Sequence, residues 1–303
     1  MKTSNNTYIL GGLFVLLAVT TACTGSLTTS GDDSMEESIP LRVFASIDGT
    51  ASTRTVPDVT VYDRSSFKVN DVIRLVRTLG GATSSGNYQL TSLVATTQTW
   101  TAMSGSTEFM YQSAATYSAF YPVDYNGVLS DQSTVEGFRM SNRLGTDADV
   151  KVAGNALLNL TLKHSNSKVT LKLVGNLDVV FPASHISFSL KGTGIRTGSA
   201  AEESVRPLRL DDAANAWCAI LLPASGGSRT IDLTLNLSGT DSEGTYTVTY
   251  AGSVTCECVA NTHYIYSLAV ENDKLILRES GIEGWTDAGD DEGYTGDFNG
   301  QPS

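Results

Sequence analysis

Short runs in which apolar and polar residues alternate dominate the chain from residue 40 to residue 285. The first run spans residues 41–47 and the clearest spans 231–237; others lie at 186–190, 246–250 and 264–270. In an extended strand every second side chain faces the same side, so each run predicts a strand with one buried face. Clusters of Gly, Ser, Asn and Asp separate the runs, and none sustains a helical period for three turns. The pattern therefore predicts an all-β chain of antiparallel β-sandwiches.

The middle of the chain contains the expected domain boundary. Two alternating runs joined by Ser165-Asn166-Ser167 predict a hairpin over residues 158–174. The segment 141–156, just before them, has few large apolar residues. We therefore expect one β-sandwich domain at 40–155 and a second at 156–285, followed by an acidic, Gly-rich tail at 286–303.

Composition narrows the functional classes. The chain has 303 residues, of which 41% are hydrophobic, and its formal net charge is −12. An acidic chain does not neutralise phosphates, so no nucleic-acid partner is expected. The mean hydropathy of −0.05 disfavours an integral membrane protein.

The N-terminus predicts export. Residues 9–22 are apolar but too short to span a bilayer comfortably, which takes about 20 residues. Small residues and Cys23 follow, as in a signal peptide at 1–22. The run Thr20-Thr21-Ala22-Cys23 resembles a bacterial lipobox, so we expect lipidation of Cys23 and a flexible linker at 23–39. The alternative is ordinary cleavage after Ala22, with Cys23 unmodified.

Motifs of catalysis or metal binding are not found in the sequence. The histidines His164, His185 and His263 have no second histidine or cysteine at ligand spacing. Neither a G-x-S-x-G nor an H-E-x-x-H motif is present. We therefore expect no enzyme activity, no metal site and no cofactor.

The remaining cysteines are Cys218, Cys256 and Cys258. Cys256 and Cys258 are two apart on a predicted strand, so they are expected to share a face. In an oxidising compartment a disulfide from Cys218 to either is conceivable. The alternative is that all three are small apolar core residues.

Four patches occur in an order that resembles a known family. They are Thr53-Arg54-Thr55, Thr116–Pro122, Leu160–Leu173, and Thr262–Val270 leading to Ile282-Glu283-Gly284-Trp285. Together they resemble the fimbrillin (Mfa-like) family of Bacteroidetes, the subunits and accessory lipoproteins of type V pili. The resemblance covers about residues 40–285. It implies transthyretin-like β-sandwich domains and assembly with other pilus subunits by donor-strand insertion. It also implies a fimbrial protein at the outer membrane and cell surface.

Arg54 is the candidate proteolytic processing site. It follows the first alternating run in a polar segment typical of loops that proteases cut. It also matches the family's Thr-Arg-Thr patch, and related major pilins resemble this layout, with an Arg-type protease cutting just after the first strand. Cutting after Arg54 would free residues 24–54 and open a groove for a neighbour's strand. The alternative is an uncut loop residue.

The predicted function is a structural subunit of a type V pilus that contributes to cell adhesion. Only residues 274–285 have late strand character, and the tail lacks apolar residues at period two. A C-terminal segment that makes a poor donor strand favours a minor, tip or accessory component of the pilus. The alternative is a monomeric surface lipoprotein that binds glycan or host protein, for which Tyr117, Tyr121 and Tyr125 would have to be exposed.

Overall fold

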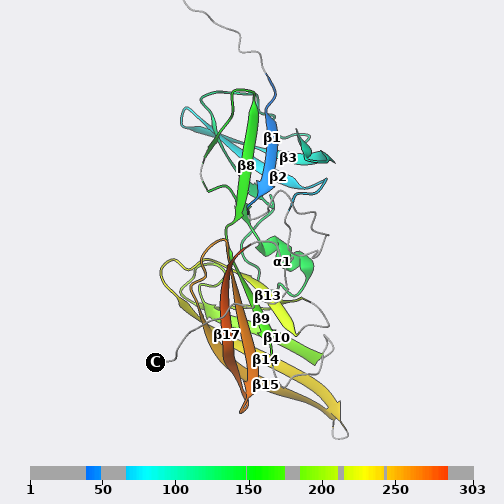
Figure 1. The fold of residues 1–303 in the computed structure, drawn as a ribbon, viewed down its shortest axis with the longest axis vertical. Coiled ribbons are helices and arrows are strands. Elements are labelled where there is room, and N and C mark those ends of the chain that lie inside the picture. The colour runs from blue at the N-terminus through cyan, green and yellow to red at the C-terminus, as the bar shows by residue number, and fades with distance from the viewer. Residues whose placement is uncertain are drawn as a thin grey trace, which may run out of the picture. The chain divides into compact units, whose positions relative to one another are not determined.

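The computed structural model describes residues 39–48, 66–147, 149–174, 185–210, 215–241 and 244–285. These residues form an eight-stranded sheet, a nine-stranded sheet and one short helix (Figure 1). None of the helical segments in these ranges is long and apolar enough to cross a membrane. Cys23, Arg54 and the tail 286–303 lie outside the described residues.

The first sheet has the order β1-β8-β6-β5-β2-β3-β4, with β7 paired to β5. Its β1–β8 pair is parallel, and its other pairs are antiparallel. The strands are β1 (Arg42–Ile47), β2 (Val72–Leu79), β3 (Ala82–Val94), β4 (Thr97–Ala102), β5 (Thr116–Tyr121), β6 (Leu144–Gly145), β7 (Val150–Lys151) and β8 (Leu157–His164).

The helix α1 (Val135–Ser141) lies between β5 and β6 in the chain. Thr134 caps its N-terminus by accepting a hydrogen bond from the backbone N–H of Gly137 at 3.1 Å.

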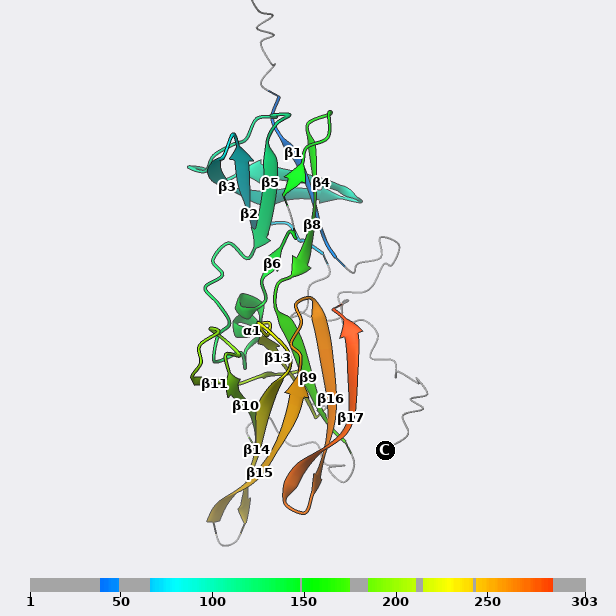
Figure 2. The same cartoon turned by 90° about the vertical axis from the view of Figure 1, so that its left-hand side faces the viewer.

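The second sheet has the order β11-β10-β14-β15-β17-β16-β9-β13-β12. Figure 2 shows its two hairpins, β14–β15 and β16–β17. They meet at one parallel pair, Ala251 with Lys274. The strands are β9 (Ser167–Leu173), β10 (Ile186–Thr193), β11 (Glu202–Val205), β12 (Leu208–Arg209), β13 (Ala216–Leu221), β14 (Arg229–Asp241), β15 (Gly244–Cys256), β16 (Thr262–Glu271) and β17 (Lys274–Gly284).

Most alternating runs of the sequence become strands with one buried face. In β14, for example, Ile231, Leu233 and Leu235 are buried, whereas the residues between them are partly or fully exposed. The run at 246–250 is an exception: it lies in β15, but its Tyr246 and Val248 side chains are exposed. Each sheet has its own apolar cluster, and the two clusters share no residue. The all-β fold with two domains that the sequence predicts is confirmed.

The expected hairpin at residues 158–174 is wrong. β8 pairs with β1 and β6 in the first sheet, whereas β9 pairs with β13 and β16 in the second. The chain therefore changes sheets at Ser165 and Asn166, after the expected boundary at residue 155. The Asn166 side chain donates to the backbone carbonyl of Ser141 at 2.8 Å, and the Ser165 N–H donates to that of Arg143 at 2.7 Å. The ladders with these neighbours take the place of the one that a hairpin would have made, and the two bonds hold the connecting residues.

A third apolar cluster lies where the segments around α1 meet the second sheet. It contains Val128, Phe138, Leu208, Cys218, Ile220 and Trp285. Beside it, the fully buried amide of Gln132 donates to the carbonyl of Ile220 at 2.9 Å and accepts from its N–H at 2.8 Å. One side chain thus pairs with β13 as a neighbouring strand would.

Candidate functional site

The first strand completes the apolar core of the first sheet. Leu41, Val43, Ala45 and Ile47 are each at most 6% exposed, whereas Arg42 between them is exposed. All four belong to the same cluster as the buried side chains of β2, β5 and β8. Burying a Leu, Val or Ile side chain contributes about 1.5–3 kcal/mol, so the domain depends on this strand for a substantial part of its stability.

The backbone of β1 has a strand ladder on one side. It pairs in parallel with β8, from Arg42 opposite Leu157 to Ile47 opposite Leu162, and it ends the order of strands in its sheet (Figure 1). Within that register Val43 faces Leu158 and Ala45 faces Leu160, and all of these side chains are buried. Without β1, the Leu side chains of β8 would line an open apolar groove.

On its other side β1 is held by the side chain of Gln98, which lies in β4. The Gln98 amide accepts from the N–H of Ala45 at 3.0 Å and donates to the carbonyl of Ala45 at 2.9 Å. Its oxygen also accepts from the indole N–H of Trp100 at 2.7 Å. Because one amide satisfies a backbone donor and a backbone acceptor, it substitutes there for a strand neighbour. Fewer bonds must break to release β1 than to release a strand with two ladders.

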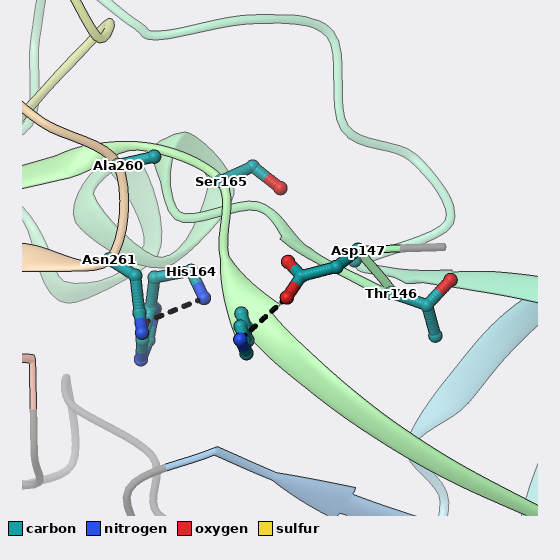
Figure 3. A pocket seen from close by; sticks show the side chains of 8 residues that line it. Thr146, Asp147, His164, Ser165, Ala260 and Asn261 are labelled. Carbon is teal, nitrogen blue, oxygen red and sulfur yellow. Dashed lines mark hydrogen bonds and ion pairs between the residues drawn. The ribbon is translucent and has the colours of Figure 1, made fainter. Parts of the chain in front are cut away.

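A polar cavity of about 380 Å³ lies close to the end of β1 (Figure 3). In it the Lys163 ammonium pairs with Asp147 at 2.5 Å and lies 3.8 Å from Asp48, the residue after β1. The hydrogen bond to Asp147 raises the pKa of Lys163, but an exposed pair of this kind contributes little to stability. The cavity is lined by Gly145, Thr146, Asp147, Lys163, His164, Ser165, Ala260 and Asn261.

Asn261 connects this cavity to the second sheet. Its side-chain oxygen accepts from the His164 N–H at 3.2 Å, as Figure 3 shows, and its side-chain nitrogen lies 3.5 Å from the Asp48 carboxylate. Its own N–H donates to Asn166, and its carbonyl accepts from Trp285. The side chains of Lys163, His164 and Asn261 in this cavity thus make contacts that hold the surrounding segments together.

The histidines described in the two sheets also have structural contacts. His164 is 3% exposed, stacks on Trp285 with a centroid distance of 3.8 Å, and has its Nδ1 2.8 Å from the Asn142 side-chain oxygen. His263 shares a hydrogen bond of 2.8 Å with the Thr170 hydroxyl. The described part of the chain contains no group of three or more potential metal ligands.

The tyrosines considered for a glycan platform lie largely in the core. Tyr117 is fully buried and Tyr121 is 7% exposed, whereas Tyr125 is partly exposed. Tyr121 packs edge-on against Phe67. A flat sugar-binding surface needs several exposed rings, so this set does not provide one.

The structure places the three cysteines in two different clusters. Cys256 and Cys258 lie in the core of the second sheet, and Cys218 lies in the third cluster with Phe138 and Trp285. A disulfide from Cys218 to either of the others stays a prediction. Lipidation of Cys23 and cleavage at Arg54 stay predictions too, because those residues lie outside the described ranges.

The two glutamines that hold strand edges were not found in the sequence. Gln98 lies 53 residues from Ala45, and Gln132 lies 88 residues from Ile220. A glutamine in a polar segment has no local feature that distinguishes such a role. The only available signal is that Gln98 stands two residues before a buried Trp.

Together these features define a class: an all-β protein of two domains, the first of which is completed by the chain's own first strand. Residues 53–285 match the model of the fimbrillin-like family, so the chain belongs to that family. No curated protein matches the chain.

Solved structures from Bacteroides have a similar fold. A candidate cell adhesion protein from Bacteroides uniformis is 16% identical, with 83% of this chain and 99% of that chain covered and a TM-score of 0.54. A second one, from Bacteroides ovatus, is 14% identical, with 81% and 97% covered and a TM-score of 0.52. At these identities the likeness shows the fold alone.

The Gln98 contact makes a testable prediction. Gln98→Ala removes both bonds to Ala45 and leaves the Trp100 indole without this acceptor, so the free energy of unfolding should fall by about 1–3 kcal/mol. Hydrogen exchange followed by NMR should show faster exchange of the Ala45 amide.

The matched control is Gln89→Ala. Gln89 lies in β3 and makes an exposed 3.4 Å bond to Asn70, so stability should change by no more than about 0.5 kcal/mol. An Ala45 amide that stays equally protected in the Gln98 variant would show that the glutamine does not hold the strand.

Proposed function

We propose that this protein is a structural subunit of a type V pilus, which receives a neighbour's strand in place of β1. The observation that carries the proposal is the position of β1. It is the first strand of the chain, its apolar face fills the core, and it pairs with β8 alone through a ladder among the described strands. A strand of this kind can leave and be replaced by another with the same alternation. The family membership supports the same role.

Processing after Arg54 is the proposed trigger. Arg54 follows the end of β1 at Ile47, so a cut there would separate all of β1 from the rest of the chain. Arg42 offers a contrast. Its side chain is exposed, but its backbone pairs with β8 and its N–H donates to Ala156 at 2.9 Å. A protease needs an extended, unpaired substrate, so Arg42 is protected until β1 leaves.

We infer that the donor segment lies within residues 274–285. β17 pairs with β16 along its length but meets β15 at one position. Leu275 is 4% exposed, whereas Ile276, Leu277 and Ile282 are 37%, 42% and 65% exposed. These residues do not keep strict alternation, so β17 fits a neighbour's groove poorly. This supports a minor, tip or accessory subunit. We propose that the subunit contributes to adhesion and has no enzyme activity.

The proposed location is the cell surface, where the lipid on Cys23 would anchor the protein to the outer membrane until the chain is cut after Arg54. Cys23→Ala should move the exported protein from the membrane fraction to the soluble fraction, because the anchor is lost. Fractionation followed by immunoblotting measures this. If the variant still partitions with the membrane as fully as the unaltered protein, the anchor is not at Cys23.

Assembly can be tested on the purified chain without its signal peptide and lipidated cysteine (24–303). Mild Arg-specific proteolysis should release β1 and yield filaments or oligomers by electron microscopy. Arg54→Ala should stay intact and monomeric under the same conditions, whereas Arg42→Ala should be cut and assemble like the unaltered chain.

Two results would contradict the proposal. One is a cut chain that remains monomeric in the presence of other pilus subunits. The other is a monomer that binds glycan or host protein without β1 leaving, which would support the monomeric surface lipoprotein instead.

The donor segment is tested in the same assay by deleting residues 286–303. The truncated chain keeps β17 and Trp285, whose indole stacks on His164, so folding and assembly should be unchanged. Circular dichroism checks the fold and electron microscopy checks the assembly. If the truncated chain folds but no longer assembles, the tail contains the donor and the inference of an accessory role is wrong.

A further inference from the structure

Two buried thiols face each other at the end of β15. Cys256 is the last residue of that strand and Cys258 follows two residues later; they are 1% and 0% exposed. Their sulfur atoms are 2.8 Å apart, and the N–H of Cys258 also donates to the sulfur of Cys256 at 3.2 Å. A disulfide bond is about 2.04 Å long, so the two atoms lie within about 1 Å of bonding distance.

The backbone turn brings the sulfurs together. Cys258 has a φ of 48°, in the left-handed region that residues other than glycine seldom adopt. This conformation ends the strand and turns the second side chain back towards the first. Two neighbours fix the turn: the Ala224 N–H donates to the Cys258 carbonyl at 3.0 Å, and the Val259 N–H donates to the Tyr264 hydroxyl at 3.1 Å.

The two thiols differ in character. The sulfur of Cys256 accepts hydrogen bonds from the thiol and the N–H of Cys258, which favour its thiolate and lower its pKa. The hydrogen bond to Cys256, together with burial, raises the pKa of Cys258. Such a pair has one sulfur suited to attack first and a second that keeps its proton until it resolves the intermediate.

We propose that Cys256 and Cys258 form a disulfide bond with each other while the exported chain folds. The bond forms by thiol–disulfide exchange with a disulfide oxidant. The Cys256 thiolate attacks one sulfur of the oxidant, forms a mixed disulfide and releases the first thiolate. Cys258 then attacks the sulfur of Cys256, displaces the second thiolate and gives up its proton. Two protein thiols are oxidised, and the disulfide of the oxidant is reduced to two thiols.

Cys218 is placed outside this pair. It belongs to the cluster of Phe138, Ile220 and Trp285, whereas Cys256 and Cys258 belong to the core cluster of the second sheet. The bond would therefore fix the turn that leads from β15 to Asn261, the residue that contacts both His164 and Asp48.

Digestion with trypsin separates Cys218 from the other two cysteines, because trypsin cuts after Arg209, Arg229 and Lys274. Residues 210–229 contain Cys218, and residues 230–274 contain Cys256 and Cys258. The full chain is unfolded with reductant, refolded in a buffer of oxidised and reduced glutathione, quenched with acid, alkylated under denaturing conditions and digested.

The expected result is that peptide 230–274 is lighter by two hydrogen atoms and takes up no alkyl group, while peptide 210–229 is alkylated. Cys218→Ala should leave this result unchanged, and Cys256→Ala should abolish it. The proposal is overturned if peptide 230–274 is fully alkylated at every glutathione ratio, or if the two peptides are recovered joined to each other. The readout on the unaltered chain does not depend on whether a variant folds.

Discussion

The first domain depends on one constraint: its apolar core is complete only when β1 occupies the edge of the first sheet beside β8. The apolar face of β1 packs against the Leu side chains of β8, which belongs to the same cluster as β2 and β5. At the same time β1 comes first in the chain and has a full ladder on one side. The domain therefore requires a strand at this edge, and any strand with the same alternation can satisfy the requirement.

The core of the second sheet contains no residue of β1, so we expect that sheet to stay folded when β1 leaves. In each sheet a glutamine amide pairs with the backbone of one strand, Gln98 with β1 and Gln132 with β13. The two glutamines differ in their exposure and in the segments that they hold. Gln132 is fully buried and joins the segment before α1 to β13, whereas Gln98 is partly exposed and holds a strand that we propose is replaced.

Much of the fold follows from the sequence, because alternation over residues 41–47 or 231–237 is a local signal of a half-buried strand. Which sheet a strand joins is not local. β8 and β9 alternate alike and are separated by a turn-like Ser-Asn, yet they belong to different sheets. The same limit applies to Cys256 and Cys258. Their spacing predicts a shared face, but the left-handed turn at Cys258 that brings the sulfurs together depends on contacts with Ala224 and Tyr264.

The central claim is that β1 leaves the mature subunit and another strand takes its place. Sequencing the N-terminus of protein isolated from filaments tests this most directly, because it reads whether β1 is still attached. The account predicts a start at Thr55, immediately after Arg54. An intact, lipidated start at Cys23 in filament-incorporated protein would contradict it.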